Sequence, residues 1–356
     1  VTEGLIAHNN NVDSNDKALV YDSFVTMVLK EVQEKTGLDP YNDGLTIETT
    51  IDSKAQQKLY DIVNTNDYIK YVNDKIQNAV VMLDTKTGAV RAVNGGRKQT
   101  TLLGYNRATD NSRSTGSTIK PVIDYGPAIE YLNYSTGQTI MDQKTTYSNG
   151  VELNNWDFSH KGAMTLRTAL VYSRNTTALQ TFKAVGEKDI KSFLNNLDIQ
   201  IKNDGQDYLV ESNSIGADIS PIKMAAAYAA FGNYGTYSKP YTVTKVTTRD
   251  GQVTEFKPEQ KQAMKDSTAY MITDVLKDSF KYGFATQAAI PGLPTAAKTG
   301  SSNYTVEQKR AMGASDYEDI IPDSWFIGYS TDYTISAWTG YDNPYEKGGG
   351  VDTTEQ

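Results

Sequence analysis

Apolar residues recur at helical spacing near the start of the chain. Over Lys17–Thr36 an apolar side chain returns every three or four positions, and Gly37 follows where a helix commonly ends. Residues 1–16 are polar and rich in Asn and Asp, which is typical of a linker. The first regular element expected is therefore a helix over Lys17–Thr36.

The pattern then changes from helical to alternating. Leu45–Ile51 alternates apolar and polar residues, which predicts a strand, and Asp52 is a suitable N-cap for a short helix that reaches Val63. The next strand begins near Ile76. We therefore expect a small α/β linker region over residues 1–76, followed by a larger domain over residues 77–356.

The larger region begins and ends with strand patterns. Val80–Leu83 and Ala89–Val93 predict a hairpin that turns at Gly88, and Trp325–Tyr329 and Tyr333–Trp338 predict a second antiparallel pair. Helical patterns occupy the sequence between them, at Ser117–Leu132, Thr165–Tyr172, Thr177–Val185, Pro221–Phe231 and Ser267–Ser279. Strands at both ends with helices between them predict an α+β fold.

Composition excludes several classes of function. The chain has 35 Lys and Arg against 43 Asp and Glu, and this net charge of -8 disfavours nucleic acid as a partner. With no Cys and 2 His, thiol nucleophiles, zinc–thiolate sites and three-His metal sites are excluded, so we expect no metal and no cofactor. No apolar run is long enough to span a membrane, so we expect any anchor to lie outside this chain.

Ser117 and Lys120 are the first candidates for catalysis. They open a predicted helix, and three residues are almost one helical turn, so a desolvated Lys120 amine could accept the Ser117 hydroxyl proton. The same spacing occurs at Ser14, in the linker, and at Ser220, before Pro221, where structural roles fit better. By itself, Ser117 is either a nucleophile or an N-cap serine followed by a surface lysine.

Ser173 and Asn175 interrupt two helical patterns at a short turn. Such a turn can direct polar side chains into a cleft, where Ser173 would relay a proton and Asn175 would hold a substrate amide. The alternative is that either residue only caps the second helix. A second serine-x-asparagine, at Ser301–Asn303, shows that the pattern is common.

Lys298, Thr299, Gly300 and Ser301 form the third candidate group. Small residues flank this Lys-Thr-Gly sequence, as a strand requires if the backbone of a ligand is to lie along it. Lys298 would attract a carboxylate, Thr299 and Ser301 would offer hydroxyls, and Gly300 would leave room. The two earlier Lys-Thr-Gly sequences end a helix and form a hairpin turn.

The order of these three groups is more informative than any one of them. Ser-x-x-Lys, Ser-x-Asn and Lys-Thr-Gly in this order are the signature of penicillin-binding proteins and class A β-lactamases. The chain resembles the transpeptidase domain of a class A, high-molecular-weight penicillin-binding protein from a Gram-positive bacterium, of the streptococcal kind. Other blocks similar to that family are Tyr105–Thr109, Gly116–Pro121, Asn155–Asp157, Met224–Tyr237, Ser267–Leu276 and Trp325–Tyr341, and Gly44–Asp52 is similar to the linker after its glycosyltransferase domain.

The resemblance implies a five-stranded antiparallel sheet between helices, as in penicillin-binding transpeptidases and serine β-lactamases. Ser117 would be acylated by the D-Ala-D-Ala end of a peptidoglycan stem peptide, with Lys120 as base and the backbone N–H groups of Ser117 and Ser301 as oxyanion hole. β-Lactam antibiotics would bind as mimics of that dipeptide. The expected location is the extracellular face of the cytoplasmic membrane, anchored by a segment outside this chain.

Some positions depart from relatives of the same fold. Arg174 replaces the Asp of class A β-lactamases, and no Glu-x-x-Leu-Asn motif occurs, so we expect slow hydrolysis and favour a transpeptidase. No Glu-Asp-x-x-Phe motif of a glycosyltransferase occurs, Tyr234 replaces a glycine of the family, and little chain follows Tyr341 for a last helix. A penicillin-sensing ectodomain, a D,D-carboxypeptidase and a β-lactamase remain alternatives.

Overall fold

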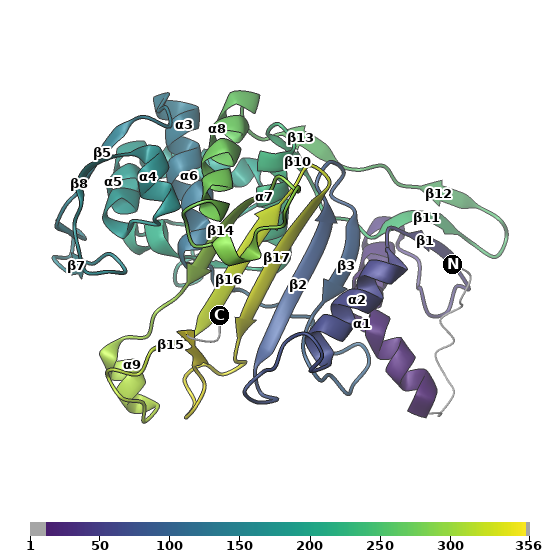
Figure 1. Cartoon of the computed structure of the whole chain (residues 1–356). Coiled ribbons are helices and arrows are strands. Elements are labelled where there is room, and N and C mark those ends of the chain that lie inside the picture. Colours follow the sequence, from purple (N-terminus) through teal and green to yellow (C-terminus); the bar gives the residue numbers. More distant parts are fainter. Residues whose placement is uncertain (1–11, 354–356) are drawn as a thin grey trace.

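A five-stranded antiparallel sheet forms the centre of the structure (Figure 1). The computed structural model describes residues 12–353. The strand order is β14-β16-β17-β2-β3, so strands from the two ends of the larger region meet in the middle of the sheet, where β17 pairs with β2. Their bounds are β2 Gln77–Asp84, β3 Val90–Asn94, β14 Ala296–Ser301, β16 Asp323–Tyr329 and β17 Tyr333–Gly340. The expected α+β fold with a five-stranded antiparallel sheet is confirmed.

Both predicted hairpins are present in this sheet. Gly88 turns the β2–β3 hairpin with φ +77°, and a Cβ at this position would lie 2.8 Å from the Cβ of Ser238. Glycine is required there because it adopts positive φ without strain and leaves room for the neighbouring strand. The β16–β17 hairpin turns at residues 330–332.

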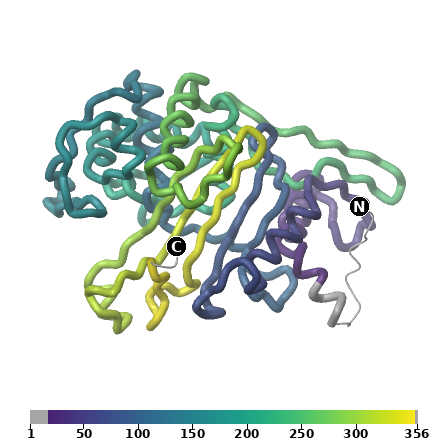
Figure 2. Tube along the Cα trace, in the orientation of Figure 1, coloured from purple at the N-terminus to yellow at the C-terminus, as the bar shows by residue number. Residues whose placement is uncertain are grey.

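Two separate helices pack against the sheet, and the second of them also contacts a helical lobe. Helix α7 (Pro221–Gly232) contacts β2, β16 and β17, and α8 (Asp266–Lys277) contacts β14. Beyond β14 a group of helices forms a lobe, as the trace in Figure 2 also shows. They are α3 Gly126–Leu132, α4 Leu166–Val171, α5 Asn175–Val185 and α6 Glu187–Asn196.

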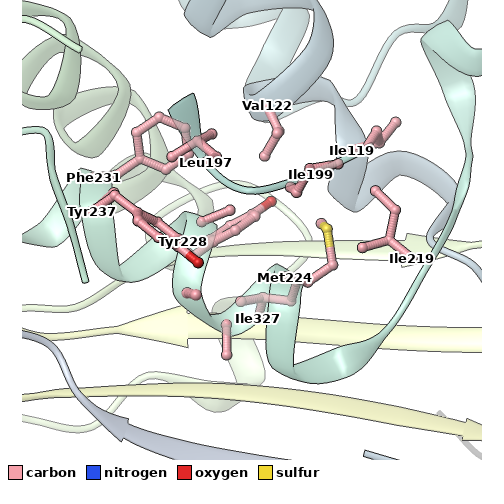
Figure 3. Packing of buried hydrophobic residues seen from close by; sticks show 14 of the residues in the cluster. Ile119, Val122, Leu197, Ile199, Ile219, Met224, Tyr228, Phe231, Tyr237 and Ile327 are labelled. Atoms are coloured by element: carbon pink, nitrogen blue, oxygen red, sulfur yellow. The ribbon is translucent and has the colours of Figure 1, made fainter. Parts of the chain in front are cut away.

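The core is continuous between the sheet and the lobe. Small alanine side chains along α7 let this helix lie close to the sheet, and Met224 and Tyr228 on it are fully buried. Figure 3 shows them between Ile327 of β16 and Ile119 and Val122 of the lobe. A close-packed core of this kind fixes the two halves relative to each other, and the boundary between them runs along β14.

The N-terminal region is joined to the larger one by hydrogen bonds. Helix α1 (Val12–Thr36) and helix α2 (Ser53–Asn64) both contact β3, and strand β1 (Thr46–Thr49) pairs with β11 (Val243–Thr247). The buried Gln56 side chain donates to the backbone carbonyls of Val20 and Val93 and accepts from Val93 N. The division at residues 76 and 77 stays a prediction.

Several short elements complete the fold. The small sheets are formed by β4 Arg113–Ser114 with β9 Asp218–Ile219, β5 Thr139–Asp142 with β8 Gly162–Thr165, β6 Thr145–Thr146 with β7 Glu152–Leu153, β10 Thr236–Ser238 with β13 Gln260–Gln262, β15 Ile320–Ile321 with β18 Val351–Asp352, and β12 Val253–Glu255 beside β11. The short helical elements are η3 Glu211–Ile215, η4 Asp278–Phe280, η5 Thr286–Ala288 and α9 Val306–Ala311.

The helix expected over Ser117–Leu132 is three helical elements instead of one. A 3-10 turn, η1 (Gly116–Ile119), is followed by a π-helical turn, η2 (Pro121–Tyr125), and then by α3. Pro121 has no N–H to donate to the preceding turn, so regular helical hydrogen bonding cannot continue through it. Lys120 therefore lies at a junction between two helical geometries.

The start of α1 and the presence of α6 differ from the sequence prediction, whereas the end of α1 agrees with it. Helix α1 begins at Val12, so Ser14, which was expected in a linker, lies in its first turn, and residues 1–11 are outside the described residues. Helix α6 was not predicted, although Ile190, Phe193 and Leu194 give it a buried face. Gly37 has φ +71° at the end of α1, as expected of a C-cap glycine.

Candidate active site

The three predicted motifs meet between β14 and the helical lobe. Ser173 Oγ is the point of contact, because it accepts a hydrogen bond of 2.9 Å from Lys298 Nζ and lies 3.3 Å from Lys120 Nζ. Lys120 Nζ also donates to Asn175 Oδ1 at 2.7 Å and to the Ser173 carbonyl at 2.8 Å. Residues far apart in sequence thus form one polar cluster in the fold.

The turn that carries Ser117 lies directly against β14. A Cβ on Gly116 would lie 2.2 Å from the carbonyl oxygen of Ser301, and a Cβ on Gly300 would lie 2.7 Å from the amide nitrogen of Thr118. Contacts this short are possible only without a side chain, so both glycines are needed for the two backbones to approach. This approach brings Ser117 and Ser301 into the same part of the site.

The hydrogen-bond pattern of β14 directs one side of the strand away from β16, and on that side the Thr299 carbonyl accepts a hydrogen bond of 2.8 Å from Lys298 Nζ. Ser302 N donates to Asp323 O at 3.1 Å, and residues opposite each other in an antiparallel pair alternate between bonded and non-bonded. The pair Ser301–Ser324 is therefore non-bonded, so the N–H of Ser301 points away from β16. Because β14 is an edge strand, the N–H of Ser301 and the backbone groups of Thr299 face the lobe.

That Lys120 accepts the proton of Ser117 stays a prediction. None of the hydrogen bonds among residues 12–353 involves Ser117 Oγ. The amine is instead directed to Ser173 and Asn175, whose oxygens accept its hydrogens. Ser117 is half-buried, so its hydroxyl remains accessible.

Burial shapes the electrostatics of the two amines. Lys120 is 0% and Lys298 2% exposed. Burial lowers the pKa of Lys298 to about 7, and burial together with the neighbouring charge of Lys298 lowers the pKa of Lys120 well below the ordinary lysine value. A lysine that is neutral near neutral pH can act as a base, whereas an ordinary surface lysine cannot.

Asp124 is a buried carboxyl on the same helical run as Lys120. Burial raises the pKa of Asp124 well above its ordinary value, although the charge of Lys120 opposes this shift. Within the described part of the chain, neither carboxyl oxygen has a hydrogen-bond partner. Sequence reasoning did not select this residue, and its position four residues after Lys120 is the signal that could have identified it.

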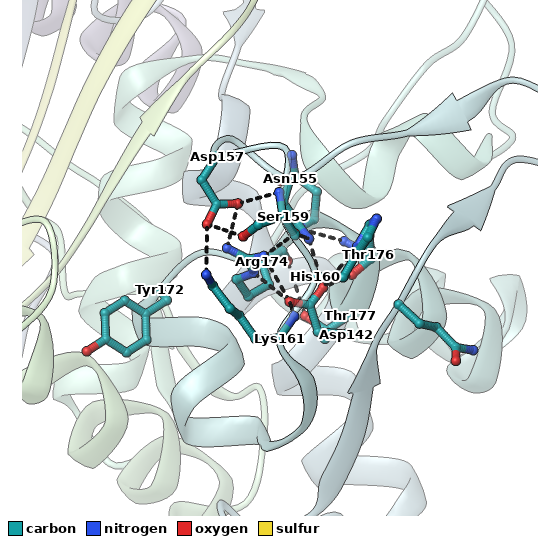
Figure 4. A network of polar contacts seen from close by, with 12 residues as sticks. Asp142, Asn155, Asp157, Ser159, His160, Lys161, Tyr172, Arg174, Thr176 and Thr177 are labelled. Carbon is teal, nitrogen blue, oxygen red and sulfur yellow. Dashed lines mark hydrogen bonds and ion pairs between the residues drawn. The ribbon is translucent and has the colours of Figure 1, made fainter.

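Arg174 connects the Ser173–Asn175 turn to Asp142 and to the segment Asp157–Ser159 (Figure 4). Its guanidinium forms ion pairs of 2.9 Å with Asp142 and with Asp157, and it also donates to the Ser159 carbonyl. Hydrogen bonds from its neighbours outweigh burial and hold the pKa of Asp142 below the ordinary carboxyl value. The guanidinium of Arg174 is therefore paired with two carboxylates.

Asn155 connects the backbone of Asn175 to Asp142 of the Arg174 network. Its Oδ1 accepts hydrogen bonds from the backbone N–H groups of Asn175 and Thr176, at 2.7 and 3.3 Å, and so caps helix α5 from another segment. Its Nδ2 donates to Asp142 Oδ1 at 2.7 Å. Sequence reasoning noted the block Asn155–Asp157 only as a resemblance and did not assign it a role.

Ser173 itself has a backbone conformation that is uncommon for a side-chain-bearing residue. Its φ is +52°, in the left-handed region that favours glycine. Conformations of this kind persist where surrounding contacts hold them, and they concentrate at functional sites. Here the surrounding contacts are the two lysines and the Arg174 network.

The described residues contain no group of three His, Cys, Asp or Glu side chains that could hold a metal ion. His160 lies 3.8 Å from Asp142 in the Arg174 network, and His8 lies outside the described residues. Within residues 12–353, no helix is both long and apolar enough to cross a membrane.

Comparison with known proteins identifies the family. Residues 78–354 match the family model "Penicillin binding protein transpeptidase domain". The chain is 43% identical over 326 residues to penicillin-binding protein 1A/1B of Bacillus subtilis, covering 90% of this chain and 35% of that protein. It is 38% identical over 352 residues to penicillin-binding protein 1A of Streptococcus oralis, covering 96% and 54%. The chain thus spans about half the length of these relatives, or less.

Solved structures support the same fold. The penicillin-binding protein PonA1 of Mycobacterium tuberculosis superposes with a TM-score of 0.77 at 22% identity, covering 92% of this chain and 83% of that one. A second structure of PonA1, in complex with penicillin V, has the same TM-score and covers 93% and 85%. The chain therefore belongs to the family of penicillin-binding protein transpeptidase domains, and it is of the class A type found in Gram-positive bacteria.

Proposed function

We propose that this chain is a peptidoglycan D,D-transpeptidase domain that works through an acyl-enzyme on Ser117. The observation that carries the proposal is the position of Ser173 Oγ between the amines of Lys120 and Lys298, next to the backbone contact between η1 and β14. Two buried amines with lowered pKa values, joined by one hydroxyl, form a path along which a proton can move.

The substrate would lie along the free edge of β14. The D-Ala-D-Ala end of a stem peptide offers an extended backbone, which can pair with the outward groups of Thr299 and Ser301 as an added strand. Its terminal carboxylate would meet Lys298 and the hydroxyls of this strand. Asn175 uses Oδ1 for Lys120 and one Nδ2 hydrogen for the Asn154 carbonyl, which leaves one hydrogen for a substrate carbonyl.

Acylation would begin with attack of Ser117 Oγ on the carbonyl of the penultimate D-Ala. The neutral amine of Lys120 takes the hydroxyl proton, and the developing oxyanion is stabilised by the N–H groups of Ser117 and Ser301. The peptide C–N bond then breaks, and the departing nitrogen receives a proton through Ser173. The products are an ester on Ser117 and free D-Ala.

The second half-reaction would transfer the acyl group to an amine of another stem peptide. That amine attacks the ester, the ester C–O bond breaks, and the proton of the amine returns through the same path to Ser117 Oγ. A β-lactam would acylate Ser117 in the same way, but its leaving group stays attached. PonA1 of Mycobacterium tuberculosis has been solved with penicillin V, which supports β-lactam binding by this fold.

The same proposal includes the cellular location of the domain and the division of the chain into two regions. Cross-linking acts on peptidoglycan, so the domain would work on the extracellular face of the cytoplasmic membrane, anchored by a segment outside this chain. We also propose that residues 1–76 form the linker region and residues 77–356 the transpeptidase domain. Neither a metal nor an organic cofactor enters the mechanism.

The experiment that tests the function uses a thioester analogue of the stem peptide. The chain is acylated with the analogue, and release of the acyl group is followed with and without a D-amino acid acceptor. Faster release with the acceptor, together with an aminolysis product, supports a transpeptidase. Rapid release without an acceptor contradicts it and indicates a carboxypeptidase or β-lactamase, and a stable adduct that neither water nor amine removes indicates a sensor.

A further inference from the structure

The carboxylate of Asp323 joins three segments at the end of β14. Asp323 is 3% exposed and opens β16. Its Oδ2 accepts a hydrogen bond of 2.7 Å from Ser302 Oγ, and its Oδ1 accepts one of 2.9 Å from Trp338 Nε1. The same Oδ1 forms an ion pair of 2.9 Å with Arg113 Nε. Both carboxylate oxygens therefore have polar partners.

Arg113 belongs to the segment that leads into η1 and Ser117. Besides its ion pair with Asp323, its Nη1 donates to the Tyr341 carbonyl at 2.8 Å, and its guanidinium lies 5.3 Å from the ring of Trp338. These contacts fix the guanidinium from several directions. The backbone of the following residue, Ser114, accepts a hydrogen bond of 2.8 Å from Trp325 Nε1, so this segment is tied to β16 twice.

Ser302 makes the contact between Asp323 and β14, as Arg113 makes the contact between Asp323 and the segment before η1. It follows Ser301 at the point where β14 ends, and its backbone N–H and its hydroxyl both donate to Asp323. Asp323 thus holds the end of the strand that carries one proposed oxyanion donor. Through Arg113 it also holds the segment that carries the other donor, Ser117.

We propose that Asp323 is a positioning residue that sets the spacing between the backbone N–H groups of Ser117 and Ser301. The inference rests on the proposed function, because these groups form an oxyanion hole only if Ser117 is acylated. Asp323 acts through Arg113 and Ser302 and does not touch the substrate. A carboxylate suits this role because its two oxygens can accept from all three donors and balance the charge of Arg113.

The test compares two variants with a matched control. Asp323→Asn removes the charge and one acceptor, and Ser302→Ala removes only the tether on β14. Asp332→Asn makes the same chemical change in the turn at the other end of β16, where the side chain is 67% exposed. Each protein is titrated with a penicillin to separate non-covalent affinity from the acylation rate. The infrared band of the ester carbonyl is then recorded on the acyl-enzyme.

We expect Asp323→Asn to lower the acylation rate roughly 10- to 100-fold, which is less than the loss of a whole oxyanion donor. Ser302→Ala should show a smaller loss. In both variants the non-covalent affinity should stay within about 2-fold, and the carbonyl band should move to higher frequency because its hydrogen bonds are weaker. Asp332→Asn should match the wild type.

Wild-type acylation rates and an unshifted carbonyl band in both variants would overturn the inference. So would a parallel loss of affinity, rate and melting temperature with no band shift, since that describes a general loss of structure. If Asp323→Asn does not fold, the acylation rate and the carbonyl band of Ser302→Ala still test the inference. If the wild-type chain itself gives no ester band, the proposed function fails, and that outcome is distinct from a failure of Asp323 alone.

Discussion

The hydroxyl of Ser173 lies 2.9 Å from the amine of Lys298, on a residue whose backbone is held in a left-handed conformation. Both amines donate to this oxygen, Lys298 at 2.9 Å and Lys120 at 3.3 Å, so the hydroxyl lies within hydrogen-bond reach of each of them. The hydroxyl can then pass a proton in either direction without leaving its position. The predictions below test the roles that this arrangement gives to each side chain.

Ser117→Ala should abolish the covalent adduct with penicillin, because it removes the proposed nucleophile. The melting temperature should stay unchanged, since the Ser117 hydroxyl makes none of the hydrogen bonds found among the described residues. Intact-mass analysis and peptide mapping make the measurement. Ser220→Ala is the control, because Ser220 has the same serine-x-x-lysine spacing and makes no side-chain cap. An adduct mapped to Ser220 or Ser173 would contradict the assignment.

Lys120→Arg should lower the acylation rate by several orders of magnitude, because a guanidinium stays charged and cannot act as a base. General-base catalysis is worth about 10²- to 10⁴-fold. Lys298→Arg should have a milder effect, since an anchor for a carboxylate needs only positive charge. Stopped-flow acylation with a chromogenic cephalosporin measures both. Equal losses in the two variants would show that the division of roles is wrong.

The affinity for carboxylate-bearing substrates should depend on the charge of Lys298. Burial lowers its pKa to about 7, and an amine is charged below its pKa and neutral above it. The Michaelis constant for a stem-peptide thioester should therefore rise with pH above about 7, by up to about tenfold per pH unit. Lys298→Arg should remove this rise, because arginine stays charged throughout. A flat profile in the wild-type chain would argue against an anchoring ammonium.

Arg174→Ala should destabilise the fold by about 3–5 kcal/mol, because it leaves the buried carboxylate of Asp142 without its cation. Urea unfolding gives the free energy of unfolding. The control is Arg310→Ala, which removes an ion pair whose arginine side chain is 65% exposed, so solvent screening should leave the free energy of unfolding almost unchanged. Similar costs for both variants would mean that the Arg174 network is not a structural support.

The three motifs could be located in the sequence because each of them is short and local. Lys298–Gly300 and the hairpin around Gly88 could be assigned from small residues, turn chemistry and alternation within a few positions. The contacts that support the site could not be assigned in this way. Asp142 reaches Arg174, and Asp323 reaches Arg113, across long stretches of chain, and a buried ion pair leaves no periodic signal in one sequence.

Local geometry was the other source of error. The pattern over Ser117–Leu132 was helical throughout, and it could not reveal that Pro121 separates a 3-10 turn from a π-helical turn. That junction matters because it sets the direction of the Lys120 side chain. The prediction that Lys120 lies near Ser117 assumes regular helical spacing and stays a prediction, and the hydrogen bonds of the Lys120 amine go to Ser173 and Asn175.

The hydrogen bonds of Gln56 provide a direct mechanical connection between α1 and the central sheet. Its amide links the backbones of Val20 and Val93, so α1, α2 and the β3 edge of the central sheet are tied at one point. A pull applied to the chain before α1 would therefore load the sheet itself instead of stretching a flexible tether. Any movement of α1 would therefore be transmitted to the β3 edge of the central sheet.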